Sequence, residues 1–147
     1  MIKVAQQNAP KISFHVADIN NLPFETESFD SVISASLLNI VSNREKAITE
    51  MVRVCRSGGT ISVLVPLAGF NDIKLNALKS SLQTTGFSFE ALRTWHKLAP
   101  KMTVSEISNL FGELGLKAQE PKKYLNGMVF SITAIKGTLL QCPCCRK

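Results

Sequence analysis

The 147-residue sequence has no apolar run of about 18 residues, which excludes a conventional transmembrane helix. Its first ten residues, MIKVAQQNAP, lack the apolar stretch of a secretory signal and have the character of an amphipathic helix. We therefore expect no membrane association and a cytoplasmic location.

The sequence also lacks a concentrated basic surface, although its formal net charge is +6. Lysine and arginine occur singly or in pairs, and no cluster of aromatic residues accompanies them. Nucleic-acid binding modules combine a basic stripe with aromatic or groove-reading residues. The charge pattern therefore does not favour a nucleic-acid partner.

Cysteine is scarce outside the last residues. Cys55 lies in a helical pattern, and the other three thiols crowd a tail at 139–147, at Cys142, Cys144 and Cys145. A structural zinc site usually needs two pairs of ligands at C-x(2–4)-C spacing. Only Cys55, His15 and His96 could complete such a set, so we expect no metal site and interpret the tail as frayed chain with exposed thiols, with zinc as the alternative.

The remaining composition is that of a globular domain, with 45% hydrophobic and 19% charged residues. We assign residues 1–138 to a single domain. Residues 2–8 have the pattern of a helix that ends at Asn8 and Pro10. The runs at 12–18 and 31–36 are almost continuously apolar, which is typical of strands covered on both faces in a parallel sheet.

A helix is predicted at 43–56 because Ser42 and Glu45 form a capping box before a periodic apolar face. Gly58 and Gly59 should end it, and a buried strand should follow at 60–66. Strands and helices in this alternating order predict an α/β fold with right-handed crossovers.

The pattern loosens over 67–101, where two helices are expected, one ended by Gly86 and the other begun by Ser88. A second capping box, TVSE at 103–106, predicts a helix that stops at Gly115. Two final strands, 116–125 and 127–137, should form an antiparallel hairpin around Asn126 and Gly127.

Several motifs in this order resemble a known family. The stretch VADINNLPFETESFDSVISASLLNIV, then NREKAITEMVRVCRSGG, then TISVLVP is similar to the class I S-adenosylmethionine-dependent methyltransferases of the ubiquinone-biosynthesis-like branch, methyltransferase type 11. The resemblance implies an α/β, incomplete Rossmann-like sheet, mostly parallel with a C-terminal antiparallel hairpin. It also implies S-adenosyl-L-methionine as cofactor and methyl transfer to a small-molecule acceptor.

The resemblance assigns the cofactor to two strand ends. Asp18 and Ile19 match the positions that read the adenine, and a carboxylate, being acceptor-only, suits the exocyclic amine. Ser34 and Ala35 match the point that passes close to the methionine part. From the residues alone, a loop-initiating acid that caps local N–H groups is the preferred interpretation of Asp18, and the resemblance favours the adenine role instead.

The acceptor should meet Leu38 and Asn39, and the helical segment 67–101 should cover it through Trp95 and His96. Many relatives carry a histidine pair where this sequence has Asn39 and Ile40. An asparagine can orient an acceptor but cannot take a proton, so no general base is identified. Trp95 could instead anchor its helix to the core, and His15 should be a packed or surface histidine.

The family's G-x-G-x-G loop is absent, since none of the eight glycines makes that spacing. Without the strands that accompany it, the segments 12–18 and 31–36 would pair directly, be joined by another chain, or leave open edges. We expect a homodimer or a complementing chain. The alternative function is a non-catalytic remnant, or separately encoded half of a methyltransferase, that binds a partner; methylation of RNA or DNA is a third hypothesis.

Overall fold

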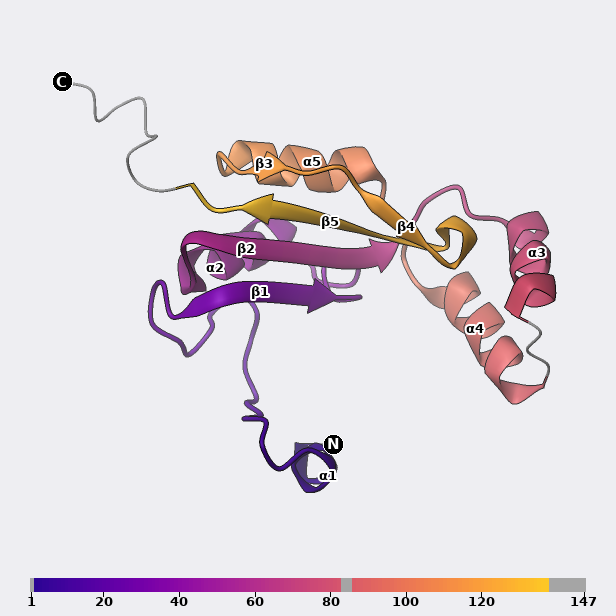
Figure 1. Ribbon diagram of the computed structural model, residues 1–147, viewed down its shortest axis with the longest axis horizontal. Helices are drawn as coiled ribbons and strands as arrows, with labels where there is room; N and C mark the ends of the chain where they lie inside the picture. The colour runs from indigo at the N-terminus through magenta and orange to yellow at the C-terminus, as the bar shows by residue number, and fades with distance from the viewer. Residues whose placement is uncertain (1, 83–85, 138–147) are drawn as a thin grey trace.

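The computed structural model of the chain describes residues 2–82 and 86–137 and has an α/β architecture (Figure 1). The elements follow in the order α1 (Ile2–Asn8), β1 (Phe29–Ala35), α2 (Arg44–Val54), β2 (Cys55–Pro66), α3 (Asp72–Leu82), α4 (Phe87–Leu98), α5 (Val104–Glu113), β3 (Lys117–Ala118), β4 (Lys122–Tyr124), a 3-10 turn (Leu125–Gly127) and β5 (Val129–Ile135). None of the helices in the described ranges is long and apolar enough to cross a membrane.

The five strands of the described residues form one sheet in the order β1-β2-β5-β3, with β4 also paired to β5. The β1 and β2 strands run parallel, whereas β5 is antiparallel to β2, β3 and β4. The expected fold class, an incomplete Rossmann-like sheet with an antiparallel C-terminal part, is confirmed. In this order β1 is an edge strand.

One face of the sheet carries the main core. Alternate residues of β2 and β5, such as Ile61, Val63 and Phe130, are fully buried there beside α2 and α5. The opposite face carries hydroxyls that pair across strands, for example Ser62 with Thr133 at 3.0 Å. The alternation therefore distinguishes a helix-covered apolar face from a more polar one.

A second, smaller cluster joins α3 and α4, which stand beyond the carboxyl end of β2 in Figure 1. Its buried members are Phe70, Leu75, Leu78, Phe89 and Met128. Met128 comes from the turn before β5 and so attaches the two helices to the end of the sheet. The expectation of two helices within 67–101 is confirmed.

The predicted strand at 12–18 is wrong. The structure forms no strand here: Asp18 makes only an isolated bridge to Asn21, and Val16 is 88% exposed. A strand exists only where a neighbour accepts its hydrogen bonds, and β1, the nearest candidate, does not pair with this segment. High β-propensity alone therefore does not produce a strand here.

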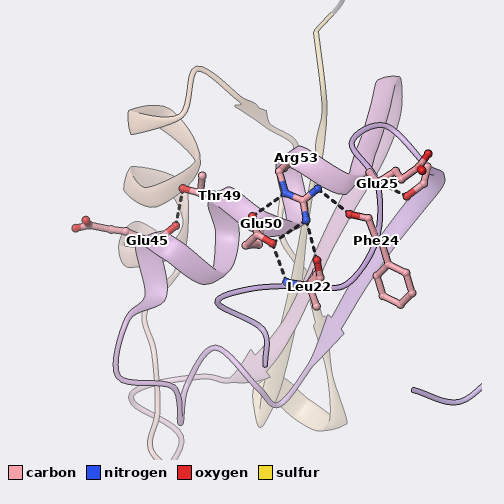
Figure 2. Close-up of polar contacts among 8 residues, drawn as sticks. Leu22, Phe24, Glu25, Glu45, Thr49, Glu50 and Arg53 are labelled. Atoms are coloured by element: carbon pink, nitrogen blue, oxygen red, sulfur yellow. Dashed lines mark hydrogen bonds and ion pairs between the residues drawn. The ribbon is translucent and has the colours of Figure 1, made fainter. Parts of the chain in front are cut away.

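The loop after this segment is fastened to α2, as Figure 2 shows. Glu50 accepts a hydrogen bond from the Leu22 N–H at 2.8 Å, and Arg53 donates to the carbonyls of Leu22 and Phe24 at 3.0 and 2.8 Å. Glu50 and Arg53 also form a two-pronged ion pair with its shortest contact at 2.7 Å. We call this arrangement the Glu50–Arg53 clasp.

Two predicted boundaries of α2 are corrected. The N-cap is Asn43, whose side chain accepts from the Lys46 N–H, so the predicted box with Ser42 does not form. The helix ends at Val54, and both glycines lie within β2, which already begins at Cys55. Gly58 has φ +77°, a left-handed conformation that glycine adopts without cost.

The C-terminal part follows the prediction more closely. Thr103 and Glu106 form the predicted capping box of α5, and Gly115 follows that helix with φ +69°. The predicted strand 116–125 is divided into β3 and β4, and a 3-10 turn replaces the two-residue hairpin connection. Asn126 adopts φ +54° in that turn, a conformation that asparagine tolerates.

Candidate functional site

Asp18 stands in an exposed turn immediately before the clasped loop. Its Oδ1 accepts from the Asn20 N–H at 2.9 Å and from Asn20 Nδ2 at 3.0 Å. These two hydrogen bonds, led by the one to the backbone, lower the pKa of the Asp18 carboxyl below its ordinary value. The side chain is thus ionised at neutral pH, and Oδ2 makes no hydrogen bond to the described residues.

Ile19 is half-buried and packs against the main core. This contact orients the turn, because burying an aliphatic side chain fixes the backbone on either side of it. Both alternatives for Asp18 are therefore compatible with the geometry. One carboxylate oxygen caps the turn, and the other is open to a donor from a ligand.

Ser34 and Ala35 end β1 on opposite faces of the sheet. Ser34 is 95% buried on the helix-covered face, since 5% of it is exposed, and its Oγ has no hydrogen-bond partner in the described chain. Ala35 is exposed. Ser36 follows with φ +52°, an unusual value for a residue other than glycine, and turns the chain away from the sheet.

Leu38 and Asn39 occupy the loop after β1. Leu38 is completely buried in the main core, so it packs instead of presenting a surface. Asn39 is also buried, and its Nδ2 donates to the Pro100 carbonyl at 3.1 Å. This hydrogen bond connects the loop after β1 to the segment that follows α4.

Trp95 and His96 lie on α4. Trp95 packs against the smaller cluster, which fits the interpretation that it anchors its helix. His96 is buried with its ring edge-to-face against Phe70, the centroids 5.0 Å apart. Burial lowers the pKa of His96, and nearby Lys101 lowers it further, so the imidazole is neutral at pH 7.

The buried polar side chains within residues 2–82 and 86–137 are Ser34, Asn39 and His96. All three belong to the set that the sequence pointed to. In addition, the buried side-chain atoms without a partner in that part of the chain are Asn20 Oδ1, Ser34 Oγ and Asn39 Oδ1. Buried polar atoms normally have hydrogen-bond partners, so a ligand, a water molecule or another chain is expected to supply them here.

Other predicted positions are less connected to this arrangement. His15 is exposed, and its ring lies edge-to-face with Phe24 at 5.3 Å, which agrees with a surface histidine. Among the described residues, no three histidine, cysteine or acidic side chains come together as a metal site. The cysteines of the tail at 139–147 lie outside the described residues.

Sequence reasoning missed the Glu50–Arg53 clasp. The i,i+3 spacing of an acid and a base on α2 was visible, but such pairs are usually solvent-exposed. Here the Glu50 side chain is only 14% exposed, and hydrogen bonds from Arg53 and the Leu22 N–H lower its pKa to about 2. The clasp fixes the loop that directly follows Asp18, Ile19 and Asn20.

Residues 1–63 match the family model described as "Methyltransferase domain". This part of the chain is similar in sequence to the methyltransferase domain family. It is 45% identical over 64 residues to a demethylmenaquinone methyltransferase of Paenarthrobacter aurescens, covering 43% of this chain and 25% of that protein. It is 40% identical over 63 residues to ajmaline N-methyltransferase of Rauvolfia serpentina, covering 43% of this chain and 22% of that protein.

The methyltransferase fold extends beyond the matched sequence. A possible histamine N-methyltransferase of Thermotoga maritima superposes with a TM-score of 0.64 at 18% identity, covering 92% of this chain and 69% of that one. A methyltransferase of Aquifex aeolicus gives a TM-score of 0.65 at 13% identity over 91% of this chain and 60% of that one. The sequence matches span only about a quarter of the curated relatives.

Proposed function

We propose that the protein takes part in S-adenosylmethionine-dependent methyl transfer to a small-molecule acceptor. The observation that carries the proposal is the agreement between the buried polar residues and the positions implied by the methyltransferase resemblance. Ser34, Asn39 and His96 are buried at cost, because each removes polar atoms from water. A cofactor and acceptor beside the carboxyl end of β1 would give partners to Ser34 Oγ and Asn39 Oδ1, which have none in the described residues.

The residues present fit one part of the cofactor. In this proposal, Asp18 Oδ2 accepts from the adenine amine and the Ile19 N–H donates to a ring nitrogen. The turn hydrogen bonds keep Asp18 ionised and hold it in place before a ligand arrives. The sequence offers no G-x-G-x-G loop, so the described chain supplies no backbone cradle for the rest of the molecule.

When bound, the cofactor supplies a methyl group that is already electrophilic. The task of the chain is therefore to align the acceptor and exclude water. Asn39 would orient an acceptor through its free Oδ1, because its Nδ2 is already engaged with Pro100. His96 is neutral and buried, so it favours an apolar environment and does not bring a positive charge near the acceptor.

Isothermal titration calorimetry with S-adenosylmethionine and S-adenosylhomocysteine tests this function. We expect Asp18→Asn to weaken binding about 10-fold or more, because a charge-assisted hydrogen bond contributes about 1.5–3 kcal/mol. Asparagine can still cap the Asn20 N–H, which preserves the turn. Glu120→Gln, at an exposed position between β3 and β4, is the matched control and should leave the affinity unchanged.

Two results would count against the proposal. If neither compound binds the native protein below millimolar concentration, the polypeptide does not act as a methyltransferase alone. If Asp18→Asn binds as tightly as the native chain, the carboxylate does not read the adenine. The cytoplasmic location expected from the sequence remains part of the proposal.

The second candidate function is a non-catalytic module that binds a partner chain. It is favoured by the apolar side chains exposed along β1, Phe29 and Ile33. Calorimetry separates the two functions, because a module of this kind would bind no cofactor. Methylation of a nucleic acid would instead require binding to RNA or DNA that weakens steeply with salt.

A further inference from the structure

A hollow of about 540 Å³ lies beyond the carboxyl end of β2. It is lined by Leu67, Lys74, Lys123, Tyr124 and the turn Leu125–Gly127. Figure 1 shows α3 and the connection from β4 to β5 at this same end of the sheet, and the two are in contact. None of the residues assigned above to the cofactor or the acceptor lines the hollow. Its volume is within the range of about 300–1,000 Å³ that is usual for small-molecule sites.

The charge that lines this hollow is positive. Lys74 and Lys123 bring two ammonium groups to it, and the lining includes no acidic side chain. Neither lysine forms an ion pair within residues 2–82 and 86–137. The Nζ of Lys74 makes one long hydrogen bond, to the Gly69 carbonyl at 3.5 Å. Asp72 is close to Lys74 in sequence but lines a different hollow, between α3 and α4.

The place of Lys74 on its helix adds to the positive potential. Lys74 lies in the first turn of α3, where the partial charge of the helix N-terminus is also positive. A cation gains nothing from the helix at this position, and Asp72 in the same turn offsets only part of the repulsion. An anion beside Lys74 would therefore be attracted by the ammonium group and by the helix end together.

The turn that borders the hollow has an unusual backbone. Leu125, Asn126 and Gly127 have φ values of +51°, +54° and +85°. Glycine and asparagine tolerate the left-handed conformation, but it is unfavourable for leucine. Strained residues of this kind cluster at ligand sites. The turn leaves Leu125 partly exposed, so the hollow offers apolar surface beside its two charges.

We propose that this hollow binds the anionic group of a small organic acid, a carboxylate or a phosphate, through Lys74 and Lys123. The apolar part of the same molecule lies against Leu67 and Leu125. Lysine ammonium groups bind either anion, because they act as point charges with three donors each. Tyr124 adds a hydroxyl, whose contact with Ser131 Oγ is long, at 3.4 Å, and can be exchanged for a contact with the ligand.

The hollow also indicates a class of methyl acceptor, and this point rests on the proposed function. Open α/β sheets bind their ligands outside the carboxyl ends of parallel strands. The hollow lies beyond this end of β2, and Ser34 lies at the same end of the parallel neighbour β1. The acceptor would then be an organic acid that is held by its anionic group. The anion site itself does not require S-adenosylmethionine, so its test is separate.

Titrations followed by ¹H–¹⁵N nuclear magnetic resonance, without cofactor, measure binding and its location. The probes are benzoate, phenyl phosphate and the neutral benzyl alcohol. The two anions should shift the amide signals of the turn Leu125–Gly127, and benzyl alcohol should bind about 10-fold more weakly or less, because it forms no charge-assisted hydrogen bond. The anion with the higher affinity identifies the group that the hollow prefers.

Charge-neutralising variants test the two lysines. Lys74→Gln and Lys123→Gln should each weaken binding of the anions about 5-fold or more, because each removes a hydrogen bond to a charged group. Lys117→Gln, at an exposed position on β3 outside the hollow, is the matched control and should leave the affinity unchanged. All three side chains are exposed, so circular dichroism should show an unchanged fold.

Four results would overturn the proposal. They are no binding of either anion at millimolar concentration, equal binding of benzoate and benzyl alcohol, equal effects of Lys117→Gln and Lys74→Gln, and signal shifts at Asp18 and Ser34 in place of the turn. Equal effects of the lysine variants would indicate attraction to the net charge of the whole chain. Because these titrations contain no S-adenosylmethionine, a failure of cofactor binding in calorimetry counts against the proposed function alone.

Discussion

Replacing Glu50 by glutamine should destabilise the protein by about 2–3 kcal/mol at pH 7. The change from the ordinary pKa of 4.5 to about 2 corresponds to about 3 kcal/mol at 1.36 kcal/mol per pKa unit. The partial exposure of Arg53, 30% of its side chain, reduces this value through solvent screening. Glutamine keeps the volume of the side chain and one hydrogen-bond acceptor, so the decrease in unfolding free energy comes mainly from the loss of the negative charge.

The effect should depend on pH in one direction. The carboxyl of Glu50 has a lower pKa in the folded chain than in the unfolded chain, so its contribution is complete above about pH 4.5 and is lost as the pH falls toward 2. Urea unfolding followed by circular dichroism at pH 7 and pH 3 measures the difference between native and variant. We expect that difference to fall to less than half at pH 3.

Glu90→Gln is the matched control. Glu90 pairs with Arg93 at the same i,i+3 spacing on α4, but both side chains are about half exposed. Exposed pairs contribute little, so this variant should change the unfolding free energy by less than about 0.5 kcal/mol. If Glu50→Gln behaves like the control, or if its effect is independent of pH, the clasp does not stabilise the loop as argued.

Two further substitutions test the packing, each by urea unfolding. Gly59→Ala should destabilise the protein by about 2 kcal/mol or more, because an added Cβ would lie 2.7 Å from both the Asp30 carbonyl oxygen and Cys55 Sγ. The control Gly112→Ala, which has open space around it on α5, should be neutral or stabilising. Equal effects of the two substitutions would contradict this explanation. Thr103→Ala should lower the free energy of unfolding by about 1 kcal/mol, because the capping box is lost. Thr103→Ser keeps the hydroxyl and should retain most of that stability. If serine destabilises as much as alanine, the hydroxyl is not the cause.

The helices were the most predictable elements, because their signals are local. A capping box and a periodic apolar face are complete within the segment itself, and they located α5 correctly and α2 to within two residues at its C-terminal end. The strand predicted at 12–18 failed for the opposite reason. Its hydrogen bonds depend on a neighbour, and propensity in residues such as Val16 carries no information about whether one is present.

Sequence reasoning pointed to the buried polar residues of the candidate site but did not predict the Glu50–Arg53 clasp that fixes the neighbouring loop. Family resemblance pointed to Ser34, Asn39 and His96, which the fold buries. The Glu50–Arg53 clasp could not be predicted, because its partners are main-chain atoms of a loop 28 to 31 residues away in sequence. Side chains that hold backbone by long-range contacts leave no periodic signal.

The position of β5 has a consequence for synthesis of the protein. This strand is the last one in the described residues, yet it lies inside the sheet. Its pairs with β2 join residues such as Ser62 and Thr133, which are 71 positions apart. The main core is also incomplete without β5, because Phe130 and Ile132 of this strand are buried in it and β5 contacts α5. The domain therefore cannot complete its folding until residue 135 has emerged from the ribosome, and shorter nascent chains expose β2 to the surroundings.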